Sequence, residues 1–301
     1  MKDCLTQGAV IPDDMITELR DSTDKAGDGA ELARRLEADG YIFMRGVVGC
    51  EAIAAARREV FERLEGVGEI KAPAVDGIAT GESRRRELAE DLGEFWQSVC
   101  EGEALRCVTH GAELRKLMTS VLGEPAQPHD YLFLRPGAVG RSTQLHYDRP
   151  FFSRGSDRIY TVWGALGDIP VTEGPLVVVE GSNGFTDLIE QAHAIDYESK
   201  SSPLVAILDD VVTLAKKRGS RLLTANFTPG DVIVFGMSTL HGTLDNHSPA
   251  CRVRLSFDVR YQPLADPVDD RYSGPNPGGT TGIGYGELNA AKPMTEPRHT
   301  R

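Results

Sequence analysis

The stretch Arg252-Val253-Arg254-Leu255-Ser256-Phe257-Asp258-Val259-Arg260-Tyr261 alternates polar and apolar residues without a break. Successive side chains of a β-strand point to opposite faces, so one face of this strand is polar and the other is apolar. On an exposed strand the polar face would simply be solvated. In a barrel that helices cover from outside, the apolar face must point outward and the arginines inward. Because a buried guanidinium is costly without an anionic partner, the stretch predicts an anion inside such a barrel.

The residues before this strand have the pattern of a β core. Short β runs separated by Gly, Pro and Asp turns cover residues 130–134, 144–147, 159–166, 176–180, 221–227, 232–235 and 253–261. Many short strands with such turns are typical of a barrel or a sandwich. We therefore expect a mainly β core over residues 129–262. An insertion at about residues 185–219, with one helical stretch at 209–217, would either cover the barrel mouth or form a surface loop.

The first 128 residues are predicted to be rich in helix. Helical apolar spacing occurs in residues 31–36 and 50–64, with a short strand at 41–44 between them. The spacing returns from residue 84 to 122 and stops at a Gly-Glu-Pro sequence. The tail, residues 263–301, holds many Gly and Pro residues and is expected to be irregular. These parts indicate one α+β domain over residues 1–301.

Two histidines and one aspartate indicate a metal site. His146 and Asp148 are two residues apart, so a strand places both on one face. His241 follows the compact apolar strand 232–235. Two imidazoles and a carboxylate suit a ferrous ion and leave three neighbouring coordination positions free, whereas a closed four-ligand site leaves none. His-X-Asp alone is more typical of a hydrogen-bonded surface pair, but His241 and the arginine-bearing strand favour the metal site.

Composition limits the partners. The net charge of -12 disfavours nucleic acid and anionic membranes. Five cysteines without a close-spaced pair indicate reduced thiols. Neither a signal peptide nor an apolar run of membrane-spanning length is visible. We expect a cytoplasmic protein, either a monomer or a homodimer, that acts on a small molecule.

Taken together, the motifs resemble the phytanoyl-CoA dioxygenase family of iron(II)- and 2-oxoglutarate-dependent oxygenases, especially its bacterial members acting on small natural products. The matching segments follow one order along nearly the whole chain: residues 39–47, 145–148, 162–166, 173–182, 229–231 and 241–256. The resemblance implies a double-stranded β-helix, that is, a cupin-like jelly roll, flanked by N-terminal helices. It also implies three cofactors or cosubstrates, namely Fe(II), 2-oxoglutarate and O2.

The same resemblance implies roles for individual residues. His146, Asp148 and His241 look like the iron ligands. In the family, the arginine that binds 2-oxoglutarate follows the distal histidine. Counting the commonest spacing from His241 gives Arg252, whereas matching the sequence of the strand gives Arg254. We prefer Arg254 because loops absorb insertions more readily than strands do. Both arginines lie on one face, so strand geometry alone leaves the choice open.

Four further residues resemble positions that line the site in relatives. Thr143 and Trp163 match contacts to the cosubstrate carboxylates, and Tyr131 and Thr243 match other lining positions. In a regular strand, the side chains of Thr143 and His146 would point to opposite faces. A role for Thr143 in the site therefore requires a bend before His146.

The implied reaction decarboxylates 2-oxoglutarate to succinate and CO2 and hydroxylates an unactivated C–H bond of a small metabolite. Asp148 favours hydroxylation, or a related desaturation or cyclisation, because related halogenases carry a small residue there. A cupin-like metal enzyme that does not use 2-oxoglutarate and a non-catalytic barrel that binds a small molecule stay open. Three arginines, Arg149, Arg154 and Arg158, would either meet an anionic substrate group or pair with the many acidic residues.

Overall fold

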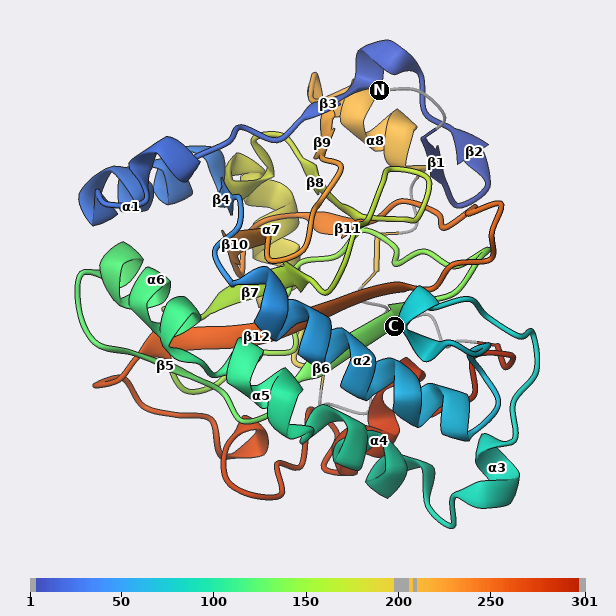
Figure 1. The fold of residues 1–301 in the computed structure, drawn as a ribbon. Coiled ribbons are helices and arrows are strands. Elements are labelled where there is room, and N and C mark those ends of the chain that lie inside the picture. Colours follow the sequence, from blue (N-terminus) through green and yellow to red (C-terminus); the bar gives the residue numbers. More distant parts are fainter. Residues whose placement is uncertain (1–3, 198–205, 208–209, 298–301) are drawn as a thin grey trace.

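The computed structural model describes residues 4–197, 206–207 and 210–297. Helices, two larger β-sheets and a two-stranded sheet of β1 and β2 make up this part of the chain (Figure 1). The α-helices are α1 Gly29–Asp39, α2 Cys50–Gly66, α3 Arg85–Leu88, α4 Leu92–Cys100, α5 Glu103–Thr109, α6 Ala112–Leu122, α7 Thr186–His193 and α8 Val211–Arg218. The strands are β1 Leu5–Thr6, β2 Ala9–Val10, β3 Ile16–Glu18, β4 Tyr41–Met44, β5 Ala126–Pro128, β6 Phe133–Gly137, β7 Tyr160–Ala165, β8 Leu176–Val179, β9 Leu222–Thr224, β10 Val232–Gly236, β11 His241–Thr243 and β12 Arg254–Pro263.

The larger sheet has the order β4-β10-β7-β12-β5, and β6 also pairs with β12. All of its pairings are antiparallel. The smaller sheet has the order β11-β8-β9-β3, in which only β3 and β9 run parallel among the described strands. The expected α+β class is confirmed, and the strands of its two larger sheets pair mainly antiparallel.

The apolar side chains divide into layers around the two sheets. One buried cluster lies between the sheets and joins Trp163 of β7 to Val178 of β8 and Phe235 of β10. A second cluster joins the other face of the larger sheet to helices, which lie over this face in Figure 1. Leu255 and Phe257 of β12 belong to this second cluster, so their face packs outward against helices as expected. The polar face of β12 therefore points into the fold.

The helical prediction for residues 84–122 is confirmed, whereas one strand prediction was wrong. The helical spacing from residue 84 to 122 is divided among α3, α4, α5 and α6, and α5 and α6 each follow a glycine, Gly102 and Gly111. The expected strand 144–147 is not a regular strand. Within it, only His146 forms a bridge, which pairs it with His241.

The insertion and the tail have little strand structure. Helices α7 and α8 lie in the insertion, and residue 209 of the expected helix 209–217 lies outside the described residues. The tail contains 3-10 turns, of which Asn289–Ala291 is the last. Arg85 donates hydrogen bonds to the carbonyl oxygens of Ala290 (2.6 Å) and Ala291 (2.8 Å), so it ties the tail to the helical part. No helix in the described part of the chain combines the length and the apolar character of a membrane span.

Candidate metal centre and adjoining cavity

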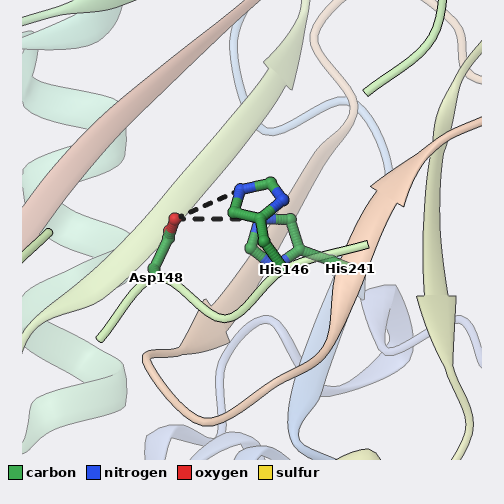
Figure 2. A group of neighbouring side chains, drawn as sticks. All are labelled: His146, Asp148 and His241. Carbon is green, nitrogen blue, oxygen red and sulfur yellow. Dashed lines mark ion pairs between the residues drawn. The ribbon is translucent and has the colours of Figure 1, made fainter. Parts of the chain in front are cut away.

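The three candidate ligands lie together. One ligand atom from each of His146, Asp148 and His241 lies within 4.8 Å of the others. Asp148 Oδ1 is 3.6 Å from His146 Nε2 and 3.9 Å from His241 Nε2 (Figure 2). The structure thus brings the predicted set of two imidazoles and one carboxylate around a common point, as a ferrous ion requires.

An irregular backbone pairing places His146 beside His241. The two residues exchange backbone hydrogen bonds of 2.9 and 3.1 Å, and Thr243 N–H donates to Thr143 O at 3.0 Å. Between these pairings the chain advances three residues from Thr143 to His146 but only two along β11. One extra residue on one side of a pairing is the pattern of a β-bulge. Gly242 permits this close approach, because a Cβ there would lie 2.6 Å from Thr143 O. The bulge supplies the bend that the parity of Thr143 requires.

Each imidazole is oriented by a backbone carbonyl. His146 Nδ1 lies 2.9 Å from Gln144 O, and His241 Nδ1 lies 2.9 Å from Thr239 O. A carbonyl oxygen only accepts hydrogen bonds, so Nδ1 carries the proton and Nε2 keeps a free lone pair. Burial lowers the pKa of His146 to about 4 and also lowers the pKa of His241. Both rings are therefore neutral near pH 7, which is the form that binds a metal.

The second oxygen of Asp148 is held in place by hydrogen bonds. Asp148 Oδ2 accepts one from Thr161 Oγ1 (2.6 Å) and one from Arg260 Nη2 (2.8 Å). The Arg260 guanidinium lies 4.3 Å from the ring centre of Phe133 and 4.6 Å from that of Phe152. Burial alone would raise the pKa of Asp148, but Arg260 and the two histidines outweigh it and hold this pKa well below its usual range. Asp148 is thus an ionised carboxylate with Oδ1 available.

A cavity opens onto two members of the triad, His146 and Asp148. Its walls come from β6, residues 142–148, β12 and tail residues 288–290. His146 and Asp148 line it, together with Thr143 and Arg254. The structure therefore brings two of the residues predicted to contact a cosubstrate into the same cavity as two of the candidate metal ligands.

Arg254 lies in a pocket made by its neighbours in the sheet. It pairs across β6 with Gly137, where a Cβ would lie 3.0 Å from the guanidinium nitrogens Nε and Nη2. Arg254 Nη1 donates to Ser256 Oγ, and Nε has no hydrogen-bond partner among the described residues. Burial lowers the pKa of Arg254 to about 10, so the group stays cationic at neutral pH. A buried cation of this kind fits an anionic ligand.

Arg252 has a different environment. Its side chain is 39 % exposed, and its Nε lies 3.4 Å from Glu173 Oε1. Arg252 does not line the cavity. The two arginines therefore share a strand face in the sequence pattern but have different partners in the structure.

The other three predicted contact residues also lie outside the cavity lining. Thr243 Oγ1 accepts the backbone N–H of Thr143 at 2.7 Å. Trp163 lies between the sheets, with its ring centre 4.7 Å from that of Phe227. Tyr131 stacks on Tyr285 at 4.5 Å in the helix-covered cluster. Cosubstrate contacts by these residues stay predictions.

Several residues at the site were missed in the sequence. Arg260 and Thr161 contact Asp148, Arg135 lines the cavity, and the tail forms part of the wall. The alternation of β12 does place Arg260 on the inward face. Its contact with Asp148 depends on the pairing of β12 with β7, where Arg260 lies opposite Thr161, and this register is not visible in the sequence.

The three arginines considered for substrate binding pair with acidic residues instead. The ion pairs are Arg149–Asp157 (2.8 Å), Arg154–Asp196 (3.3 Å) and Arg158–Glu124 (2.6 Å). None of these arginines lines the cavity.

Comparisons with known proteins agree with this geometry. The model of the family "Phytanoyl-CoA dioxygenase (PhyH)" matches residues 36–254. A 1-deoxypentalenic acid 11-beta-hydroxylase from Streptomyces exfoliatus is 26% identical over 268 residues, which cover 84% of this chain and 87% of the relative.

Solved structures show a related fold. One is the epimerase SnoN in complex with Fe3+, alpha ketoglutarate and nogalamycin RO, with a TM-score of 0.54 and 19% identity over 80% of this chain and 85% of that chain. Another is EctD from S. alaskensis with 2-oxoglutarate and 5-hydroxyectoine, with a TM-score of 0.52 and 18% identity over 87% of this chain and 88% of that chain.

Proposed function

The chain belongs to the phytanoyl-CoA dioxygenase family of iron(II)- and 2-oxoglutarate-dependent oxygenases, and on this premise we propose that it hydroxylates an unactivated C–H bond of a small organic metabolite. The observation that carries the proposal is the cluster of His146, Asp148 and His241, of which His146 and Asp148 line one cavity with Arg254. We propose further that the two sheets form the family's double-stranded β-helix within a single domain. Their antiparallel pairing and the apolar cluster between them support this architecture.

The donor set fits Fe(II). Two neutral imidazole nitrogens and one carboxylate oxygen are the usual ligands of oxygen-using non-haem iron, and they leave three coordination positions for other ligands. The hydrogen bonds that His146 Nδ1 and His241 Nδ1 donate, and the one that Asp148 Oδ2 accepts, fix which atoms remain free for the metal. The solved structures with Fe3+ and with 2-oxoglutarate support the same assignment by analogy of fold.

Arg254 is the proposed anchor for the distal carboxylate of 2-oxoglutarate. It lies in the cavity with a buried guanidinium, and Ser256 beside it adds a hydroxyl group. Arg252 is a weaker candidate because its ion pair with Glu173 is outside the cavity lining. Thr143, which lines the cavity, is a proposed further contact.

The outcome of the reaction follows from the ligand set. When bound, iron and 2-oxoglutarate would activate O2, the oxidant, for C–H cleavage, and 2-oxoglutarate would be oxidised to succinate and CO2. Asp148 occupies the carboxylate position, so a halide would have to displace a ligand that Arg260 and Thr161 already hold. Hydroxylation is therefore favoured over halogenation.

The proposal is tested by succinate release. Purified protein with Fe(II), 2-oxoglutarate and O2 is assayed against a library of small metabolites. Wild-type protein and a His193→Ala control, altered on the exposed surface of α7, should release succinate with at least one compound, whereas His241→Ala should release none. Equal succinate release from His241→Ala and wild type would contradict the proposed metal site.

A further inference from the structure

Positively charged groups outnumber negatively charged ones around the cavity. Arg135, Arg254 and Arg260 line it. Two carboxylates contact these groups: Asp148 binds Arg260, and Asp258 Oδ2 lies 2.6 Å from Arg135 Nε. Three guanidinium groups therefore face two carboxylates. If the proposed function holds, the two positive charges of Fe(II) cancel the two negative charges of 2-oxoglutarate, so the loaded cavity keeps a net charge of +1.

Arg135 is the arginine that can reach an incoming ligand. Its side chain is 35 % exposed, whereas Arg254 is 5 % and Arg260 is 2 % exposed. Among the described residues, the Arg135 side chain donates one hydrogen bond, from Nε to Asp258. Within the part of the chain that the structure describes, Nη1 and Nη2 make none. The contact with Asp258 holds the guanidinium in place, and no described residue accepts a hydrogen bond from its two outer nitrogens.

The strand that carries Arg135 directs it into the cavity. Phe133, Arg135 and Gly137 alternate along β6, and Gly137 faces the Arg254 guanidinium. The Arg135 guanidinium carbon lies 5.3 Å from the ring centre of Phe133. Arg254, which is more deeply buried, is the proposed cosubstrate anchor, so Arg135 is available for the substrate.

Most of the remaining lining is apolar. It includes Leu134, Phe151, Leu288 and Ala290. A ligand that fits this lining has an apolar body and one group that pairs with a guanidinium. Two free outer nitrogens match the two oxygens of a carboxylate.

We propose that the substrate is an apolar organic acid with one carboxylate, and that Arg135 binds this carboxylate through Nη1 and Nη2. The proposal rests on the proposed function, because the count of charges includes the metal and the cosubstrate. It assigns Arg135 to substrate selection and leaves cosubstrate binding to Arg254.

The test uses a panel of aliphatic and aromatic monocarboxylic acids, each paired with its methyl ester. Anaerobic protein is first loaded with Fe(II) and 2-oxoglutarate, and the visible charge-transfer band reports loading. Each compound is then added, and both the change in the band and the succinate release after admission of O2 are measured. Acids should produce these responses, and their esters should not.

Variants locate the effect. Arg135→Gln should raise the acid concentration for a half-maximal response by at least about tenfold, because it removes a charge-assisted contact. Arg135→Lys should restore part of the response because it keeps the charge. Arg221→Gln removes the same charge from an exposed ion pair with Glu180 and should respond like wild type.

The outcomes separate the two proposals. Absence of the band in wild-type protein would overturn the proposed function itself. A normal band with equal responses to acids and esters, with no response to any acid, or with an unchanged acid response in Arg135→Gln would overturn the substrate assignment alone.

Discussion

At the scale of single residues, a hydrogen bond orients each candidate ligand. In each side chain, the polar atom that is not available to the metal makes this hydrogen bond. The spacing of His146 and Asp148 and the distant His241 could be found in the sequence, because the ligand types are characteristic. The contacts of Arg260 and Thr161 with Asp148 could not, because they depend on the register between β12 and β7. Residue types therefore predict which atoms bind a metal, and tertiary pairing decides what holds those atoms.

Replacing Arg260 should weaken iron binding. Arg260→Leu removes the charged donor to Asp148 Oδ2 and leaves only Thr161 to orient the carboxylate. Loss of such a contact lowers metal affinity by about 10- to 100-fold. Anaerobic Fe(II) titration would measure the change. Thr161→Val, which removes the neutral donor, should have a smaller effect, and an equal affinity in Arg260→Leu and wild type would refute the role of Arg260.

The partly buried His110 should make the folded state less stable in acid. Burial and the nearby Arg106 lower the pKa of His110 from 6.5 to about 3. Between these values the unfolded chain binds a proton that the folded protein does not. The free energy of unfolding therefore falls as the pH is lowered from about 7 toward 3, by at most about 1.4 kcal/mol per pH unit for one histidine.

The His110 prediction is checked by urea unfolding of metal-free protein near pH 7 and near pH 5.5. His110→Gln should lose less stability between the two pH values than wild type does. The exposed His193 provides the control position for the same substitution. Identical losses in His110→Gln and wild type would show that His110 does not contribute.

At the scale of elements, the bulge between residues 143 and 146 decides the geometry of the site. The opposite parity of Thr143 and His146 indicates a bend in the sequence. The position of the extra residue follows only from the backbone hydrogen bonds to β11. For the same reason the expected regular strand 144–147 was wrong: its pairing partner β11 is short, and the bulge interrupts the alternation.

A methyl group on Gly242 should disturb both the bulge and the metal site. In Gly242→Ala the Cβ would lie 2.6 Å from Thr143 O, so the segment that carries His146 must move away from β11. Overpacking of this kind destabilises by about 1–3 kcal/mol. Thermal unfolding and Fe(II) titration would both report the change.

Gly236→Ala is the matched control for this substitution, because a Cβ at Gly236 has no neighbour within 4 Å. The control should retain stability and iron binding. Unchanged iron affinity in Gly242→Ala would show that the bulge does not position His146.

At the scale of the whole molecule, distant parts of the chain meet at one cavity. The sequence predicted the helix-rich first part, the β core and the irregular tail. It did not predict that residues 288–290 line the cavity, because no local pattern shows where an irregular segment packs. Arg85 makes this connection through the carbonyl oxygens of the tail and through Glu69 Oε2 at 2.5 Å.

Breaking the pair of Arg85 and Glu69 should release the tail. Both side chains are fully buried, and removal of one partner from a buried ion pair costs about 3–5 kcal/mol. Arg85→Met should therefore lower the free energy of unfolding and speed proteolytic cleavage after residue 263. The double variant Glu69→Met with Arg85→Met should recover part of the stability but not the protection of the tail. A tail as resistant as that of wild type in Arg85→Met would contradict the proposed connection.

The central claim is that His146, Asp148 and His241 hold Fe(II) while Arg254 anchors 2-oxoglutarate in the same cavity. Anaerobic titration with Fe(II) and 2-oxoglutarate, followed by the visible charge-transfer band, tests it most directly. Wild-type protein and Arg252→Leu should form the band, and Arg254→Leu should form it only at much higher 2-oxoglutarate concentration. No band in wild-type protein, or a band lost in Arg252→Leu and kept in Arg254→Leu, would contradict the claim.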